Sequence, residues 1–181
     1  VFLGTCNGYL NHAEQLSVDT SSVSQEYVLQ FPLASITAPV LVRNVFYELD
    51  SAELTYDSTA ALDSLAALLQ ENPNVTIELS SHCDYRGKDE YNENLSQRRA
   101  ESVVNYLIEH VVAADRLTPK GYGENRPKIV KRRIAEQHDF LHEGDTLTEA
   151  FIRALDTVEK QEICNALNRR TEFRVLRTTY G

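Results

Sequence analysis

The pattern of apolar and polar positions predicts a strand over residues 75–81. Val75, Ile77 and Leu79 are apolar and the residues between them are polar, which is the alternation of a strand with one buried face. Asn72-Pro73 ends the preceding element, because proline removes a backbone donor and restricts the residue ahead of it.

A helix is predicted after this strand. Residues 84–94 are polar, and we expect them to form a loop with Gly87 as its only glycine. Asn94 is the predicted helix cap, with Gln97 three residues later as in a capping box. An apolar stripe then recurs at helical spacing, formed by Ala100, Val103, Val104, Leu107 and Val111.

Two arginines in the first turn of this helix face different directions. At about 100° per residue, Arg98 points away from the apolar stripe, whereas Arg99 lies on its flank and faces the end of the strand. There Arg99 can bind a carboxylate near exposed helix N–H groups, and Asp84 at the strand end can accept from an ammonium. The pair is predicted either to grip a small zwitterion or to form a plain Asp84–Arg99 salt bridge that fastens the loop.

The remaining pattern predicts an α+β domain. An amphipathic helix is expected where Leu62, Leu65, Ala66 and Leu69 recur. Further strands are expected near Lys120–Gly123 and at Thr171–Arg177.

Residues 128–167 form a predicted insertion before the last strand, with helices over 147–155 and 158–167. Its apolar residues are expected either to pack on the sheet or to form a docking surface for a partner; they are Phe140, Leu141, Leu147, Phe151, Ile152 and Leu155.

Composition divides the chain into two parts. Residues 1–42 contain no lysine or arginine, and basic residues begin at Arg43. We predict that residues 1–41 hold a linker and the tail of a preceding β-rich domain, which resembles a carboxypeptidase-regulatory sandwich, with strands near 8–10 and 24–33. A disordered linker is the alternative. Residues 42–181 are the predicted second domain.

Several classes of function are disfavoured. The net charge of −9 argues against nucleic-acid binding, and no apolar run reaches the ~18 residues that suggest a membrane-spanning helix. The three cysteines are far apart, so neither a metal nor a disulfide framework is predicted. Adjacent strand residues point to opposite faces, so His82 is not expected to activate Cys83. We therefore predict no catalysis and no cofactor.

The chain opens without a basic signal-peptide segment, and we expect it to be the C-terminal part of a longer exported protein. Leu3-Gly4-Thr5-Cys6 faintly resembles a lipobox, so a lipidated Cys6 is a minor alternative.

A series of motifs, complete in order over about Val42–Leu176, resembles the OmpA-like C-terminal domain. This peptidoglycan-binding module is shared by outer-membrane proteins, Pal-type lipoproteins and flagellar stator proteins. Val45–Leu54 is similar to its opening strand and turn. The other motifs are His82-Cys83-Asp84, Gly87, Asn92, Leu95-Ser96, Arg98-Arg99-Ala100, Gly121-Tyr122-Gly123-Glu124-Asn125-Arg126-Pro127 and Asn168-Arg169-Arg170-Thr171-Glu172.

The resemblance implies a βαβαββ mixed sheet with helices on one face, and non-catalytic binding of diaminopimelate in the peptidoglycan stem peptide. The family's acid and second arginine hold the zwitterionic centre, at the positions of Asp84 and Arg99. Cys83 replaces the usual threonine, which places one hydroxyl contact in doubt. Asn92 and Leu95 are implied to support the ligand, Glu48 to line the pocket and Arg170 to shape its rim.

The insertion and the short tail resemble OmpA-like domains that end multi-domain periplasmic lipoproteins of type IX secretion and gliding systems. We therefore expect a cell-wall anchor at the periplasmic face of the outer membrane, with secretion or gliding proteins as further partners. A protein–protein docking module without wall binding is the alternative. Because the insertion follows Glu48, Asp84 and Arg99, we expect it to serve something other than peptidoglycan.

Overall fold

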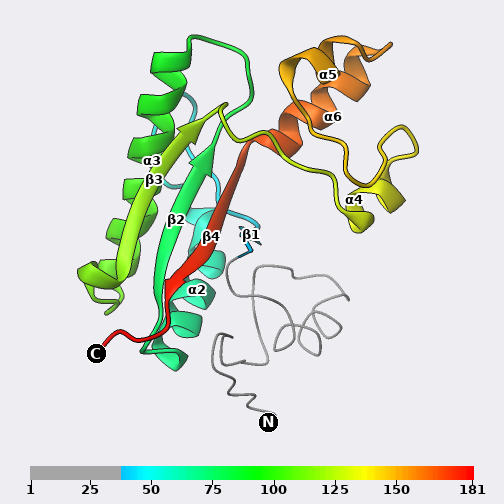
Figure 1. Ribbon diagram of the computed structural model, residues 1–181. Helices are drawn as coiled ribbons and strands as arrows, with labels where there is room; N and C mark the ends of the chain where they lie inside the picture. Colours follow the sequence, from blue (N-terminus) through cyan, green and yellow to red (C-terminus); the bar gives the residue numbers. More distant parts are fainter. Residues whose placement is uncertain (1–37) are drawn as a thin grey trace.

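Four strands form one mixed sheet in the order β1-β4-β2-β3 (Figure 1). The computed structural model describes residues 38–181, and the predictions made for residues 1–37 lie outside this range. The elements are β1 (Val40–Val42), η2 (Tyr56–Ser58), α2 (Thr59–Glu71), β2 (Thr76–His82), α3 (Asp89–Glu109), η3 (Ala114–Arg116), β3 (Leu117–Gly123), α4 (Arg132–Gln137), α5 (Glu149–Arg153), α6 (Val158–Asn168) and β4 (Arg170–Arg177).

The centre of the sheet is β2, which pairs in parallel with β3 and antiparallel with β4. The short strand β1 completes the sheet by pairing antiparallel with β4. Parallel neighbours need a crossover connection, and α3 provides it between β2 and β3. The α+β class and the mixed sheet with helices on one face are confirmed, as is the helical insertion before the last strand.

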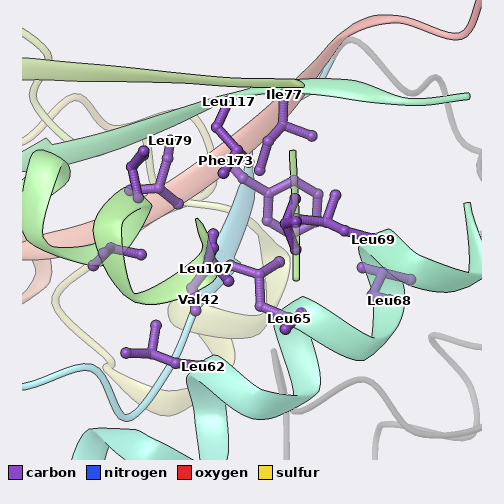
Figure 2. Packing of buried hydrophobic residues seen from close by; sticks show 14 of the residues in the cluster. Val42, Leu62, Leu65, Leu68, Leu69, Ile77, Leu79, Leu107, Leu117 and Phe173 are labelled. Atoms are coloured by element: carbon purple, nitrogen blue, oxygen red, sulfur yellow. The ribbon is translucent and has the colours of Figure 1, made fainter. Parts of the chain in front are cut away.

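The main core lies between the sheet and the helices α2 and α3 (Figure 2). Ile77 and Leu79 point from β2 into this core and are fully buried. Leu62, Leu65 and Leu69 of α2 meet them, which confirms the predicted amphipathic helix. Burying such side chains contributes about 1.5–3 kcal/mol each, so this layer fixes the position of α2 against the sheet.

Glycine in β3 allows α3 to approach the sheet closely. A Cβ on Gly121 would lie 2.6 Å from the carbonyl carbon of Ser96, so no other residue fits without displacing the helix. The Gly121 N–H donates to Gln97 Oε1 at 2.7 Å, and the Gly123 N–H donates to Ser96 Oγ at 2.9 Å. The glycines therefore hold the helix segment that carries Arg99 next to the end of β2.

The start of α3 differs from the prediction. The helix begins at Asp89 with Lys88 at the cap position, so the prediction that Asn94 caps it is wrong. Asp89 and Glu90 occupy the first turn, where acidic side chains interact favourably with the exposed backbone N–H groups of the helix. Val111 is also not part of the buried stripe. It is 84% exposed beyond the helix end, and Val112 is buried instead.

The N-terminal part of the domain also differs from the prediction. The strand β1 is Val40–Val42, two residues ahead of the expected domain start. Residues 45–54 form a turn closed by an isolated bridge between Tyr47 and Leu54, and no strand is assigned there in the part of the chain that the structure describes. Asn44 and Asp50 adopt positive φ in this region, a conformation that asparagine and aspartate tolerate better than most residues.

The insertion forms a second apolar cluster separate from the core under the sheet. The predicted helices are present as α5 and α6, whereas α4 was not predicted. The expectation that the apolar face packs on the sheet is wrong, because these side chains pack on one another beyond the sheet (Figure 1). Its fully buried members are Val130, Leu141, Leu147, Ile152 and Cys164.

Candidate functional site

Asp84 lies two residues after the end of β2 and is 8% exposed. Its Oδ1 accepts from the Arg86 backbone N–H at 2.9 Å and from Arg86 Nε at 3.2 Å. Its Oδ2 accepts from Arg86 Nη2 at 2.9 Å and from Arg169 Nη1 at 2.7 Å. The carboxylate is therefore neutralised by two arginines, one from its own loop and one from the junction between α6 and β4.

Both arginines also contact Glu162 on α6. Arg169 Nη2 donates to Glu162 Oε1 at 2.7 Å, and Arg86 Nη1 lies 3.2 Å from Glu162 Oε2. Asp84, Arg86, Glu162 and Arg169 thus form a closed set of alternating charges, called the charge ring below. Its outer members are about half exposed, whereas the Asp84 side chain is 10% exposed.

The charge ring keeps its acids ionised. Burial would raise the pKa of Asp84, but the hydrogen bonds from Arg86 and Arg169 outweigh it and hold the pKa below its ordinary value. The pKa of Glu162 is also lowered, chiefly by the hydrogen bond from Arg169. Asp84 is therefore an anion throughout the neutral range.

Arg99 lies where the helix geometry predicts it. Its side chain is half-buried, whereas the Arg98 side chain is exposed to solvent. Arg99 Nε donates to the Ser51 carbonyl oxygen at 2.9 Å, and its guanidinium stacks over the Tyr47 ring at 4.7 Å from the centroid. The turn at residues 45–54 therefore aims the guanidinium.

A cleft of about 560 Å³ opens beside Arg99. It is lined by residues 41–47, by the end of β2, and by residues 166–167 and 169–171. Four arginines contribute to its walls: Arg43, Arg99, Arg169 and Arg170. Asp84 is not itself a lining residue, but Arg169 joins it to the cleft wall through a hydrogen bond of 2.7 Å. An acid therefore lies next to this cationic cleft, in a chain whose overall charge is −9.

Asp84 and Arg99 do not pair with each other. Within residues 38–181, the salt bridges of Asp84 are with Arg86 and Arg169. The alternative of a plain Asp84–Arg99 salt bridge that fastens the loop is therefore wrong.

The structure places the other predicted residues in different roles. Asn92 is buried, and its Nδ2 donates to the Arg86 carbonyl oxygen at 2.9 Å, so it shapes the loop that carries Asp84. Leu95 is buried on α3. Arg170 lines the cleft with Arg99, whereas Glu48 is exposed in the turn and is not among the lining residues.

Sequence reasoning missed three members of this arrangement. Arg169 stands in the Asn168-Arg169-Arg170 motif, in which only Arg170 is predicted to act at the site. Arg86 lies in the polar loop, and Glu162 lies in the insertion. The insertion also supplies Ala166 and Leu167 to the cleft, a contribution that the sequence did not predict.

The pair His82 and Cys83 is not arranged for catalysis. Cys83 Sγ donates to the Asn92 carbonyl oxygen at 3.5 Å, whereas His82 Nε2 lies 3.0 Å from Ser80 Oγ on the other face of the strand. Burial raises the pKa of Cys83, which disfavours the nucleophilic thiolate. His82 is buried and stacks on Tyr122 at 5.3 Å between ring centroids, as a packed histidine does.

Residues 38–181 contain neither a cluster suited to a metal ion nor a helix suited to a bilayer. No group of three or more histidine, cysteine or acidic side chains is placed to hold a metal ion. No helix of this region combines the length and apolarity that crossing a bilayer requires.

A buried charge cluster behind the cleft fixes β4. Glu172 lies 3.0 Å from Arg170 Nε, 3.5 Å from Lys128 Nζ and 3.4 Å from His82 Nε2. Burial would raise the pKa of Glu172, but His82, Arg170 and Lys128 lower it far below its ordinary value. This cluster joins the end of β2 to β4 and to the first residue of the insertion.

Comparison with known proteins identifies the family. Residues 46–139, just over half of the chain, match the model of the OmpA family, and the chain belongs to this family. Domains of this family are non-catalytic, in agreement with the expectation from the sequence that the chain is not an enzyme.

Among similar proteins, the chain is 36% identical over 86 residues to the peptidoglycan-associated lipoprotein of Rhizobium meliloti, covering 48% of this chain and 49% of that protein. It is 35% identical over 96 residues to outer membrane porin F of Pseudomonas fluorescens, covering 53% of this chain and 29% of that protein. The matched part therefore spans half or less of these relatives.

A solved structure shows the same fold. The crystal structure of the peptidoglycan-associated lipoprotein from Burkholderia pseudomallei aligns with a TM-score of 0.51 at 23% identity, covering 73% of this chain and 88% of that one.

The first prediction concerns the buried charge cluster. Glu172→Gln leaves Arg170 and Lys128 buried without a carboxylate, so the free energy of unfolding at pH 7 should fall by about 3–5 kcal/mol. Glu136→Gln, which breaks an exposed pair with Arg132, should cost less than about 1 kcal/mol. Urea unfolding of both variants tests this, and equal losses would contradict it.

The same cluster predicts an acid-sensitive fold. Burial lowers the pKa of His82 in the folded chain. On acidification the unfolded chain therefore binds a proton at this residue at a higher pH than the folded chain, and the free energy of unfolding falls as the pH drops through about 6.5. Glu172 has a lowered pKa, so its contribution is present above about pH 4.3 and is lost as the pH falls toward the folded-state value. The difference in free energy of unfolding between the wild type and Glu172→Gln should therefore become smaller below about pH 4.3.

Proposed function

We propose that this domain binds peptidoglycan non-covalently through the diaminopimelate of the stem peptide, and so anchors an envelope complex to the cell wall. The observation that carries the proposal is the pairing of an ionised acid, Asp84, with the arginine-lined cleft that contains Arg99. A diaminopimelate centre offers an ammonium and a carboxylate together. Asp84 suits the ammonium and Arg99 suits the carboxylate.

Family membership and the names of relatives support the same function. The similar proteins from Rhizobium meliloti and Burkholderia pseudomallei are both named peptidoglycan-associated lipoproteins. In this proposal Arg170 completes the wall of the cleft, and Asn92 and Leu95 hold the loop and helix behind it. Glu48 is proposed to reach the ligand from the exposed turn.

The first binding test compares two adjacent arginines. Arg99→Ala should lose about 1.5–3 kcal/mol of binding free energy, because the ligand carboxylate is left without its hydrogen bonds. Arg98→Ala is the matched control, since Arg98 lies on the same helix but is exposed. Binding to purified sacculi measures both. Equal losses would contradict the assignment of Arg99, and a wild-type domain that does not bind sacculi would favour the alternative of a docking module.

The second binding test concerns the chemistry of the ligand. Opposed charges at Asp84 and Arg99 require a ligand end with both an ammonium and a carboxylate. Soluble stem peptides containing diaminopimelate should therefore compete with sacculi, whereas lysine-type stems that lack the second carboxylate should compete poorly. Equal competition by the two peptides would exclude recognition of the zwitterion.

The cellular context proposed here is an anchor of type IX secretion or gliding machinery at the periplasmic face of the outer membrane. The support is the resemblance of the insertion and the tail to domains from such systems. Cross-linking in a bacterium that carries this machinery should link the full-length protein to outer-membrane components of secretion or gliding. Cross-links to other envelope complexes alone would contradict this context.

A further inference from the structure

The hydrogen-bonding capacity of Asp84 is already filled in this structure. Each carboxylate oxygen accepts two hydrogen bonds, three from Arg86 in total and one from Arg169. An ionised carboxylate has about four acceptor sites. An ammonium that binds Asp84 must therefore replace one of these donors.

Arg86 is the donor that can leave more easily. Its side chain is 52% exposed and belongs to a loop, whereas Arg169 is 40% exposed and stands at the junction of α6 and β4. Arg169 holds both Asp84 and Glu162 at 2.7 Å. Arg86 approaches Glu162 at 3.2 Å through Nη1, the nitrogen that Asp84 does not use.

We propose that the ligand ammonium displaces the Arg86 side chain from Asp84, and that Glu162 of the insertion retains the displaced guanidinium. This inference rests on the proposed function and adds two positioning residues to it. The Arg86 backbone N–H keeps its bond to Asp84 Oδ1, so the loop stays in place while the side chain moves. Arg169 remains on Asp84 and keeps the carboxylate ionised in the complex.

The exchange conserves charge pairing. Before binding, two acids and two arginines share the charge ring. After binding, the ammonium pairs with Asp84 and Arg86 pairs with Glu162 alone. No charge is left without a partner, and the lost Arg86–Asp84 contact is a partly exposed ion pair of modest strength. Glu162 adds to ligand affinity because Arg86, once released from Asp84, can approach it more closely than the present 3.2 Å.

The test measures the affinity of a soluble diaminopimelate-containing stem tripeptide by calorimetry. Arg86→Ala removes the competing guanidinium, and binding should tighten about two- to fivefold, the range that one partly exposed ion pair corresponds to. Lys88→Ala, an exposed cation two residues away, is the matched control and should leave the affinity unchanged. Weaker or unchanged binding by Arg86→Ala would overturn the proposal.

The role of Glu162 is tested in two backgrounds. Glu162→Gln should weaken binding about two- to fivefold, because Arg86 released from Asp84 can no longer tighten its present 3.2 Å contact with the Glu162 carboxylate. Glu159→Gln, exposed on the same helix, is the control. In an Arg86→Ala background, Glu162→Gln should have little effect. An equal loss in both backgrounds would show that Glu162 acts only through Arg169 and would overturn its role as acceptor.

Failure of the proposed function has a different signature. If Asp84→Asn and Arg99→Ala bind the tripeptide as tightly as wild type, the proposed site is wrong and this inference falls with it. If both variants lose affinity but Arg86→Ala does not gain it, only the displacement by ammonium is wrong.

The Arg86 Nε–H signal in NMR spectra gives a direct readout of the displacement. It should shift on saturation with the tripeptide, and an unchanged signal would contradict the displacement.

Discussion

The arrangement of the site depends on one constraint, the need to keep the Asp84 carboxylate charged while it is largely buried. Burial penalises the anion, so the chain must supply cations, and it does so with Arg86 and Arg169. These arginines come from the loop after β2 and from the junction of α6 and β4, and Glu162 joins them from the insertion. A single acid thus ties three distant parts of the sequence to the edge of the Arg99 cleft.

The sheet and its buried polar face supply the rigidity that this constraint requires. Gly121 lets α3 lie against β3, so Arg99 is carried to the end of β2 by backbone packing. On the opposite face, Glu172 joins β4 to β2 and to Lys128, which fixes the strand that begins beside Arg169. The two faces therefore position the acid and the arginines independently of any ligand.

Much of the fold could be predicted from the sequence, because its signals are periodic and local. Alternation placed β2 to within one residue, and the 100° helical rotation separated Arg99 from Arg98. The start of α3 was misplaced because the segment before Asn94 is polar, although acidic residues in a first turn are themselves a helix signal. The charge ring was not predicted, because Arg86, Arg169 and Glu162 meet only through tertiary packing. Nor did periodicity indicate that the insertion would pack on itself.

The central claim is that the end of β2 binds a zwitterion between Asp84 and the Arg99 cleft. A crystal structure of the domain with a diaminopimelate-containing stem tripeptide tests it most directly. The account predicts the ligand ammonium at about 3 Å from an Asp84 carboxylate oxygen and the adjacent carboxylate at a similar distance from the Arg99 guanidinium. A tripeptide bound elsewhere, or one that contacts Arg99 while Asp84 keeps all four of its present hydrogen bonds, would contradict it.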